Sequence, residues 1–167
     1  PRCKVEVLTP DFQGLEMPIA RVIDARPDVF NHNCEVAPRL YPVARRGSTW
    51  KRSLRVLRTA KEMGGDEVAT KSGLMVGLGE SYEEMVDALG QLREHDVQII
   101  TVGQYLRPTV RHLPIVRYWH PEEFDRLAAE GMAMGFDHVA AGPLVRSSYH
   151  ADEHVPQTEP GTGPRAA

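Results

Sequence analysis

Short apolar runs alternate with longer amphipathic segments along the chain. The apolar runs have the length of strands, and the stretches between them are long enough for helical crossovers. Such an alternation, with nearly continuous apolar strands, predicts a parallel sheet covered by helices. The strands expected from this pattern are residues 5–8, 29–32, 70–78, 97–104 and 138–144.

Three of the amphipathic segments carry helix signals. The first follows the capping residue Thr49 and ends at Gly64-Gly65, because glycine is favoured just after the last turn of a helix. The second starts at Ser81, which has the spacing of a capping box with Glu84. The third starts at Pro121, which is followed by two glutamates in the first turn.

The expected fold class is therefore α/β, with a parallel sheet and outer helices. About five strands fit either a doubly wound sheet or a contiguous part of a (β/α) barrel, and in both folds functional residues gather at the carboxyl ends of the strands. Because residues 5–8 already have a strand pattern, we expect the chain to be a piece of a longer protein. Residues 152–167 are rich in Pro, Gly and Thr without periodicity, which predicts a disordered tail.

Composition and charge exclude several classes of protein. The chain has 167 residues, of which 41% are hydrophobic and 26% charged, as in a globular domain. A net charge of −3 does not indicate a polyanion partner. No apolar run is long enough to span a bilayer, and the first residues lack the apolar stretch of a signal peptide. With only Cys3 and Cys34, at no metal-binding spacing, we expect a protein of a reducing compartment.

Polar side chains follow every expected strand, at residues 9–11, 31–33, 77–80, 104–107 and 146–149. Taken singly, each has an ordinary structural explanation: asparagine is a common turn residue, and His32 has the surroundings of a hydrogen-bonded structural histidine. Taken together, they lie at the same end of a parallel sheet. This arrangement predicts a site that binds a small molecule at several points.

The most distinctive stretch is GLMVGLGE, residues 73–80. The dinucleotide pattern G-x-G-x-x-G is absent, because Tyr82 follows Gly77 and Gly79 where the third glycine would be. Glycines inside and just beyond a strand let a ligand or another backbone approach closely, although a tight turn with close helix packing explains them equally well. The direction of Lys71 stays open; a lysine that faces a barrel interior needs a partner.

Taken in order, six blocks of the sequence resemble the C-terminal half of lipoyl synthases, which are radical S-adenosylmethionine (SAM) enzymes. The resemblance covers nearly the whole chain, and its most specific parts are TKSGLMVGLGE and GPLVRSSYHAD. The blocks are VEVLTPDFQG, PDVFNHNCE with PRLY, RSLRVLRTAKEM, TKSGLMVGLGE, ITVGQYLRPTVRHLPIVRYWHPEEF and GFDHVAAGPLVRSSYHAD.

The resemblance implies a partial (β/α) TIM-type barrel, in which residues 1–151 supply the later strands and residues 152–167 form the tail. It implies the insertion of two sulfur atoms, at C6 and C8, into an octanoyl chain carried on a lysine. In this family one 4Fe-4S cluster cleaves SAM to a 5′-deoxyadenosyl radical, which abstracts hydrogen from the acyl chain. A second, auxiliary 4Fe-4S cluster donates the sulfur.

The same resemblance implies partners and a location. The expected partners are an octanoylated lipoyl carrier domain or H protein and an electron donor such as ferredoxin or flavodoxin, with neither nucleic acid nor a membrane. The expected location is the bacterial cytoplasm or, in a eukaryote, the mitochondrial matrix or the plastid.

Residue by residue, the resemblance implies a cofactor site and one metal ligand. The G-x-I-x-G-x-x-E pattern of radical SAM barrels, which supports the adenosyl group, is matched by Gly73, Met75, Gly77 and Glu80. The family blocks that face the cofactor or substrate contain Asn31, Asn33, Gln104 and Tyr105.

In the family, a serine of the R-S-S-Y motif binds one iron of the auxiliary cluster. This implies Ser147 as the ligand, with Ser148 as the alternative. Serine is a poor ligand for a soft metal beside thiolates, which suits an iron that is weakly held in a cluster that gives up sulfur. Arg146 then either lies near the negative charge of the cluster or holds the loop by hydrogen bonds.

The cluster cysteines of the family, two sets of three that include a C-x-x-x-C-x-x-C run, are absent from this chain. Cys3 and Cys34 match no cluster ligand and are expected to be incidental or core thiols. By itself the chain is therefore expected to be inactive, either as a fragment or as a degenerate relative. Two alternatives stay open: a non-catalytic, nucleoside-binding half-barrel, and an unrelated enzyme with His32, Glu80 or His112 as acid–base groups.

Overall fold

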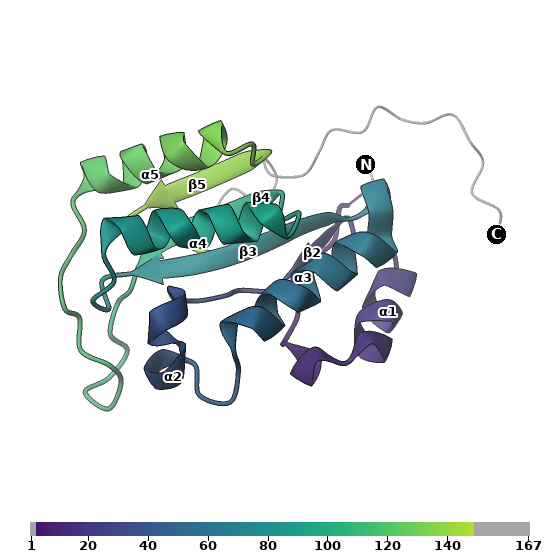
Figure 1. Cartoon of the computed structure of the whole chain (residues 1–167), viewed down its shortest axis with the longest axis horizontal. Helices are drawn as coiled ribbons and strands as arrows, with labels where there is room; N and C mark the ends of the chain where they lie inside the picture. The colour runs from purple at the N-terminus through teal and green to yellow at the C-terminus, as the bar shows by residue number, and fades with distance from the viewer. Residues whose placement is uncertain (1–2, 149–167) are drawn as a thin grey trace.

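The structure is a computed structural model that describes residues 3–148 of the chain (Figure 1). The strands within this range are β1 (Glu6–Leu8), β2 (Val29–Asn31), β3 (Ala69–Val76), β4 (Ile99–Gln104) and β5 (His138–Gly142). The helices are α1 (Glu16–Asp24), α2 (Tyr41–Ala44), α3 (Trp50–Gly64), α4 (Tyr82–Glu94) and α5 (Pro121–Ala133). Three short 3-10 helices complete the list: η1 (Phe12–Gly14), η2 (Pro38–Leu40) and η3 (Gly65–Glu67).

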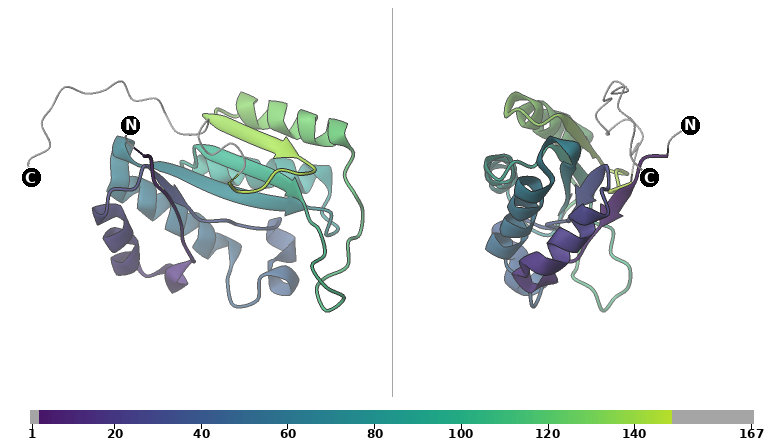
Figure 2. Two further views of the ribbon diagram at one scale, coloured as in Figure 1. Left: turned by 180° about the vertical axis from the view of Figure 1, so that it is seen from behind. Right: turned by 90° about the vertical axis from the view of Figure 1, so that its right-hand side faces the viewer.

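The strands form one sheet in the order β1-β2-β3-β4-β5, and every neighbouring pair is parallel. Parallel crossovers are right-handed in about 98% of cases, so a strand order that never reverses places the crossover helices on one face. Figure 2 shows α1, α3, α4 and α5 on one side of the sheet. The fold is a contiguous part of a (β/α) barrel, as the resemblance implied. A doubly wound sheet would reverse its strand order and carry helices on both faces.

The three helices with sequence signals form as expected. Thr49 caps α3 by accepting a hydrogen bond from the amide of Arg52. Ser81 and Glu84 form the predicted capping box of α4, each side chain accepting from the backbone amide of the other. Helix α5 starts at Pro121 and carries two acidic residues in its first turn, where the helix dipole favours negative charge.

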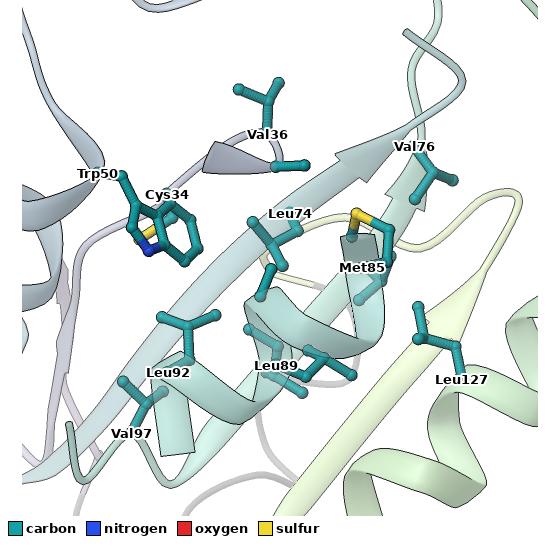
Figure 3. Packing of buried hydrophobic residues seen from close by; sticks show 14 of the residues in the cluster. Cys34, Val36, Trp50, Leu74, Val76, Met85, Leu89, Leu92, Val97 and Leu127 are labelled. Carbon is teal, nitrogen blue, oxygen red and sulfur yellow. The ribbon is translucent and has the colours of Figure 1, made fainter. Parts of the chain in front are cut away.

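The main hydrophobic core lies between the outer face of the sheet and the helices (Figure 3). Alternate residues of β3 and β4 point into it, among them Leu74 and Val76, and meet Leu89 and Leu92 of α4. Since Leu92 is fully buried, truncation to alanine is expected to cost about 2–5 kcal/mol. Because these residues face the helices, the residues between them in each strand face the opposite, inner side of the sheet.

The inner face of the sheet is closed by apolar side chains at the amino ends of the strands. Val29, Ala69 and Ile99 form a separate buried cluster there. Because side chains alternate along a strand, Asn31, Lys71 and Thr101 occupy the same face two residues further on. The inner face is thus apolar at its amino end and polar toward the carboxyl ends, where the expected site lies.

The structure differs from the sequence expectations at two kinds of position. Helix α1 was not expected, because its N-cap residue Leu15 offers no side-chain cap and Pro18 lies in its first turn. Strand β3 ends at Val76 rather than at residue 78, because Gly77 and Gly79 both take positive φ, at 104° and 105°, which ends an extended strand.

No helix among residues 3–148 is both long enough and apolar enough to cross a membrane. The expected disordered tail, residues 152–167, lies outside the described residues, and so does the expected domain boundary at residue 151.

Candidate functional site

An extra residue in the chain after β2 brings polar side chains to the inner face. Asn31 pairs with Lys71, whereas Glu35 forms a bridge with Leu74, so one strand advances by one residue more than the other. Ser72 fills the gap in the ladder, because its hydroxyl accepts from the amide of Cys34 and donates to the carbonyl of residue 32. Such bulges often re-aim side chains beside active sites.

The bulge places Asn33 over the glycine strand. A Cβ atom at Gly73 would lie 2.8 Å from the Asn33 Oδ1 atom and 3.1 Å from the Thr101 Oγ1 atom, so only glycine fits this position without displacing them. The Oδ1 atom of Asn33 is buried and has no hydrogen-bond partner among the described residues. Since buried polar atoms are nearly always paired in native proteins, this oxygen marks a place where a donor is missing.

A cavity of about 190 Å³ opens at this point of the inner face. It brings together residues from β3, β4, the bulge and the segment after β5. Its lining consists of Asn33, Glu35, Gly73, Leu74, Met75, Thr101, Gly103, Gln104, Leu106, Val145, Arg146 and Ser147. We call it the inner cavity.

The chain after β5 folds back over β4 and forms one wall of the inner cavity. A Cβ atom at Gly103 would lie 2.3 Å from the carbonyl oxygen of Val145, so the glycine allows this close approach. The Arg146 guanidinium donates to the same carbonyl at 2.7 Å. Ser147 lines the inner cavity, whereas Ser148 is exposed and does not line it. Tyr149 and His150, the other members of the polar cluster, lie outside the described residues.

The turn between β3 and α4 is held by the carboxylate of Glu80. It accepts hydrogen bonds from the amides of Gly77, at 2.6 Å, and Leu78, at 3.0 Å, and from the Trp119 indole at 2.9 Å. Glu80 is buried, at 4% exposure. Both carboxylate oxygens are therefore used to shape the turn, and neither Gly77 nor Glu80 lines the inner cavity.

Gln104 and Tyr105 hold the long segment between β4 and α5. The Gln104 side chain accepts from the amide of Trp119 at 3.0 Å and donates to the carbonyl of Arg117 at 3.3 Å. The Tyr105 hydroxyl donates to the carbonyl of Leu113 at 3.0 Å. Of the two, only Gln104 also lines the inner cavity.

Below the inner cavity, Lys71 is buried completely and points into the barrel face. Its ammonium lies 2.8 Å from the Glu6 carboxylate, which also accepts from the Asn31 amide at 2.7 Å. The lysine thus has the partner that an interior position requires. Asn31 supports this pair from beneath the inner cavity and does not line it.

The remaining candidates for chemistry have structural surroundings. His32 is buried and bonded through its ring nitrogens to the Thr9 carbonyl and the Ser53 hydroxyl, which confirms the structural interpretation. Burial lowers the pKa of His32. His112 is exposed and contacts Thr109. With Glu80 bound to the turn, the structure gives the three proposed acid–base residues different partners and does not gather them.

Neither cysteine lines the inner cavity. Cys34 is buried in the main core, and burial raises its pKa to about 11, so that it stays a neutral thiol. Cys3 is exposed. Among residues 3–148, no group of three or more His, Cys, Asp or Glu side chains is placed to hold a metal ion.

Sequence reasoning missed several residues that line the inner cavity, namely Glu35, Leu74, Thr101, Gly103, Leu106 and Val145. Gly103 carried a usable signal, because an isolated glycine within a strand pattern indicates the close approach of a ligand or backbone. Thr101 then follows from strand alternation. Glu35 carried no signal, because its position depends on the bulge.

The site combines a glycine floor, an unpartnered amide oxygen and a hydroxyl with a nearby guanidinium at the carboxyl ends of parallel strands. This arrangement suits a flat polar ligand that lies against β3 and β4 and meets donors and acceptors on its edges. Burial raises the pKa of Glu35, which lies at the wall of the inner cavity.

Comparison with known proteins gives consistent results. A lipoyl synthase from Rubrobacter xylanophilus is 58% identical over 161 residues, which is 96% of this chain and 50% of that protein. Lipoyl synthases from Dichelobacter nodosus and Idiomarina loihiensis are 55% and 53% identical over 91% and 89% of the chain. The chain spans about half the length of these curated relatives.

These identities confirm the resemblance to lipoyl synthases. The family model described as the radical SAM superfamily matches residues 1–92, which is more than half of the chain. The five-stranded parallel sheet with helices on one face agrees with this match. The chain belongs to the radical SAM superfamily.

Proposed function

We propose that this chain is the later part of the barrel of a lipoyl synthase. The activity is the SAM-dependent insertion of two sulfur atoms, at C6 and C8, into a protein-bound octanoyl group. One observation carries the proposal: the glycine strand β3 and the Val145–Ser147 segment, far apart in sequence, form walls of the same inner cavity. High identity to lipoyl synthases over most of the chain supports it.

The inner cavity suits the adenosyl portion of SAM. Gly73 and Gly103 leave the inner face of two strands without side chains, so that a flat ring can lie against the backbone. Asn33 offers an unpartnered oxygen that can accept from an amino group or hydroxyl. Met75 and Gln104 complete this wall, while Glu80 and Gly77 hold the turn beside it and Asn31 supports it from below.

This chain does not supply the cysteines of an iron–sulfur cluster. Cys34 is enclosed in the main core and Cys3 is exposed, so cysteine ligands of a 4Fe-4S cluster must come from outside residues 3–148. When bound, the clusters of this enzyme class deliver an electron to SAM and sulfur to the acyl chain. Ser147 is the residue here that we assign as the ligand of one iron, because it lines the inner cavity.

The proposal includes the partners of the reaction. An octanoylated lipoyl carrier domain or H protein brings the acyl chain, and ferredoxin or flavodoxin brings the electrons. Arg146 lies beside Ser147 with its guanidinium near Gly103, which places a positive charge close to the proposed iron ligand. A positive charge there stabilises an anionic cluster.

The proposal is tested with Ser147→Ala in the complete protein that contains this chain, with iron and sulfide restored. We expect the electron paramagnetic resonance signature of the auxiliary cluster to change and lipoyl formation to fall roughly tenfold or more. Ser148→Ala is the matched control, because Ser148 is exposed and outside the inner cavity. Unchanged spectra and turnover in Ser147→Ala remove Ser147 from the ligand set.

A non-catalytic, nucleoside-binding half-barrel is the second candidate. It is favoured by the lining of the inner cavity, which contains neither cysteine among the described residues. The same protein distinguishes the two functions: a lipoyl synthase releases 5′-deoxyadenosine from SAM after reduction, whereas a binding module binds SAM and leaves it intact.

A further inference from the structure

A second, larger cavity of about 500 Å³ lies at the carboxyl edge of the sheet, outside the inner cavity. One wall comes from the segment after β2, with Val36 and Val43, and the other from the segment after β4, with Leu113. Met75 and Leu78 form its apolar floor. We call it the outer cavity.

The two segments beside the outer cavity carry positive charges and, apart from Glu35 at the shared wall, no negative ones. Residues 36–46 contain three Arg residues and no Asp or Glu, and residues 105–113 contain two Arg residues and no Asp or Glu. This is a strong segregation in a chain whose net charge is −3. Clustering of one sign of charge around a cavity attracts partners of the opposite sign.

Several of these cations are already used within the fold, but those at the rim are not. Arg39 pairs with Glu84, and Arg45 donates to the carbonyl of Asn33. Arg46 and Arg111 line the outer cavity, and both are exposed. Among the described residues, neither guanidinium forms an ion pair or a hydrogen bond. They are available to a partner.

The outer cavity adjoins the inner one. Glu35 and Met75 line both, so a single layer of side chains separates the two spaces. Glu35 is the one acidic residue among the residues that line the outer cavity, and it lies at this shared wall rather than with the arginines on the exposed rim. A slender apolar chain that enters the outer cavity would therefore reach the wall of the inner cavity.

We infer that the outer cavity is the docking and access site for an acidic protein domain that carries an aliphatic acyl chain on a lysine side chain. Arg46 and Arg111 contact carboxylates on the surface of this domain, and the acyl chain lies along the apolar floor toward Met75. The inference rests on the proposed function, because that function supplies the carrier-bound acyl group. It adds where the carrier binds and which residues select it.

The charge contribution is tested with the double variant Arg46→Glu, Arg111→Glu in the complete protein. Its affinity for an octanoylated lipoyl domain is measured by isothermal titration calorimetry at low and at physiological salt. We expect the Kd to rise about tenfold or more at low salt, and the difference to shrink as salt is added. Arg21→Glu is the matched control, since Arg21 is exposed on α1 and lines neither cavity.

The apolar contribution is tested with Val43→Trp, which places a large side chain at the outer cavity, and with Val110→Trp as its control. Val110 is 84% exposed on the opposite segment and does not line the outer cavity. In the unchanged protein we expect the octanoylated domain to bind more tightly than the unmodified domain. Val43→Trp is expected to abolish this preference, and Val110→Trp to keep it.

Different experimental results would contradict the docking site and the proposed function. A Kd that changes less than twofold in the double variant, or an octanoyl preference that survives Val43→Trp, overturns the docking site. Absence of 5′-deoxyadenosine from the unchanged, cluster-loaded protein overturns the proposed function instead. SAM cleavage without a carrier is expected to be equal in the double variant and the unchanged protein, which confirms that the rim acts on the carrier alone.

Discussion

The buried Lys71–Glu6 pair gives the sharpest test of how the inner face is built. The change is Glu6→Gln, which keeps the shape of the side chain and removes its charge. The Glu6 carboxylate accepts from the Lys71 ammonium through one oxygen, at 2.8 Å, and from the Asn31 amide through the other, at 2.7 Å. A glutamine offers one acceptor and one donor, so it can serve only one of these two donors and repels the other.

The magnitude follows from the burial of the two partners. Breaking a buried ion pair by removing one charge typically costs about 3–5 kcal/mol, because the other charge stays buried without compensation. Lys71 is fully buried, but the Glu6 side chain is 22% exposed, so water reaches part of the pair and reduces the cost. We expect Glu6→Gln to lower the free energy of unfolding by about 2–3 kcal/mol.

Removing the lysine charge instead is expected to lower the free energy of unfolding by less. Lys71→Met removes the buried charge itself, and the partly exposed Glu6 carboxylate can still be hydrated and accept from Asn31. We expect a loss of about 1 kcal/mol for Lys71→Met and little further loss when Glu6→Gln is added.

Urea unfolding followed by circular dichroism measures all four proteins of this double-mutant cycle. The expected coupling between the two changes is about 1.5 kcal/mol or more. A coupling below about 0.5 kcal/mol, or a Lys71→Met variant less stable than Glu6→Gln, would refute the reasoning, because the lysine would then not depend on Glu6 for its burial.

Two further predictions concern the glycine strand and the buried thiol. Gly73→Ala places a Cβ atom 2.8 Å from the Asn33 Oδ1 atom, so we expect SAM binding measured by calorimetry to weaken about tenfold or more, whereas Gly90→Ala, with open space around its Cβ, leaves it unchanged. Burial raises the pKa of Cys34 from about 9 to about 11, so the unfolded thiol ionises first as the pH rises. Between pH 9 and 11 the protein is then expected to lose about 2–3 kcal/mol of stability, and the loss should be smaller in Cys34→Ala when melting is followed across this range. A similar slope in both proteins would exclude Cys34 as its source.

The sequence was sufficient to predict the five strands of the parallel sheet and the three helices with start signals. These features depend on local patterns: apolar runs, the Ser81–Glu84 capping box and the proline at the start of α5. Helix α1 was not predicted, because it lacks a side-chain cap and is stabilised by the packing of Ile19 and Ile23 against neighbouring elements. The four-residue spacing of Ile19 and Ile23 is a helical pattern, but no cap marks where the helix begins.

The composition of the site was predictable only in part. Gly73, Met75 and Ser147 line the inner cavity and were named from the sequence, and their proposed roles stay predictions. The place of Glu35 depends on one extra residue in the chain after β2, which no local pattern announces. The direction of Lys71 depends on Glu6, which is 65 residues away.

The same buried pair explains how the short strand β1 keeps its register. β1 pairs with β2 over only three residues, and Leu8 at its end is 59% exposed. Backbone hydrogen bonds and apolar packing therefore fix the register of β1 only weakly. A slip by one residue would turn Glu6 to the outer face and leave Lys71 buried without a partner, at a cost that a three-residue ladder cannot offset. The register in turn places the Thr9 carbonyl against His32 at the bulge. The charged layer beneath the inner cavity therefore aligns the edge strand with the residues that shape the site.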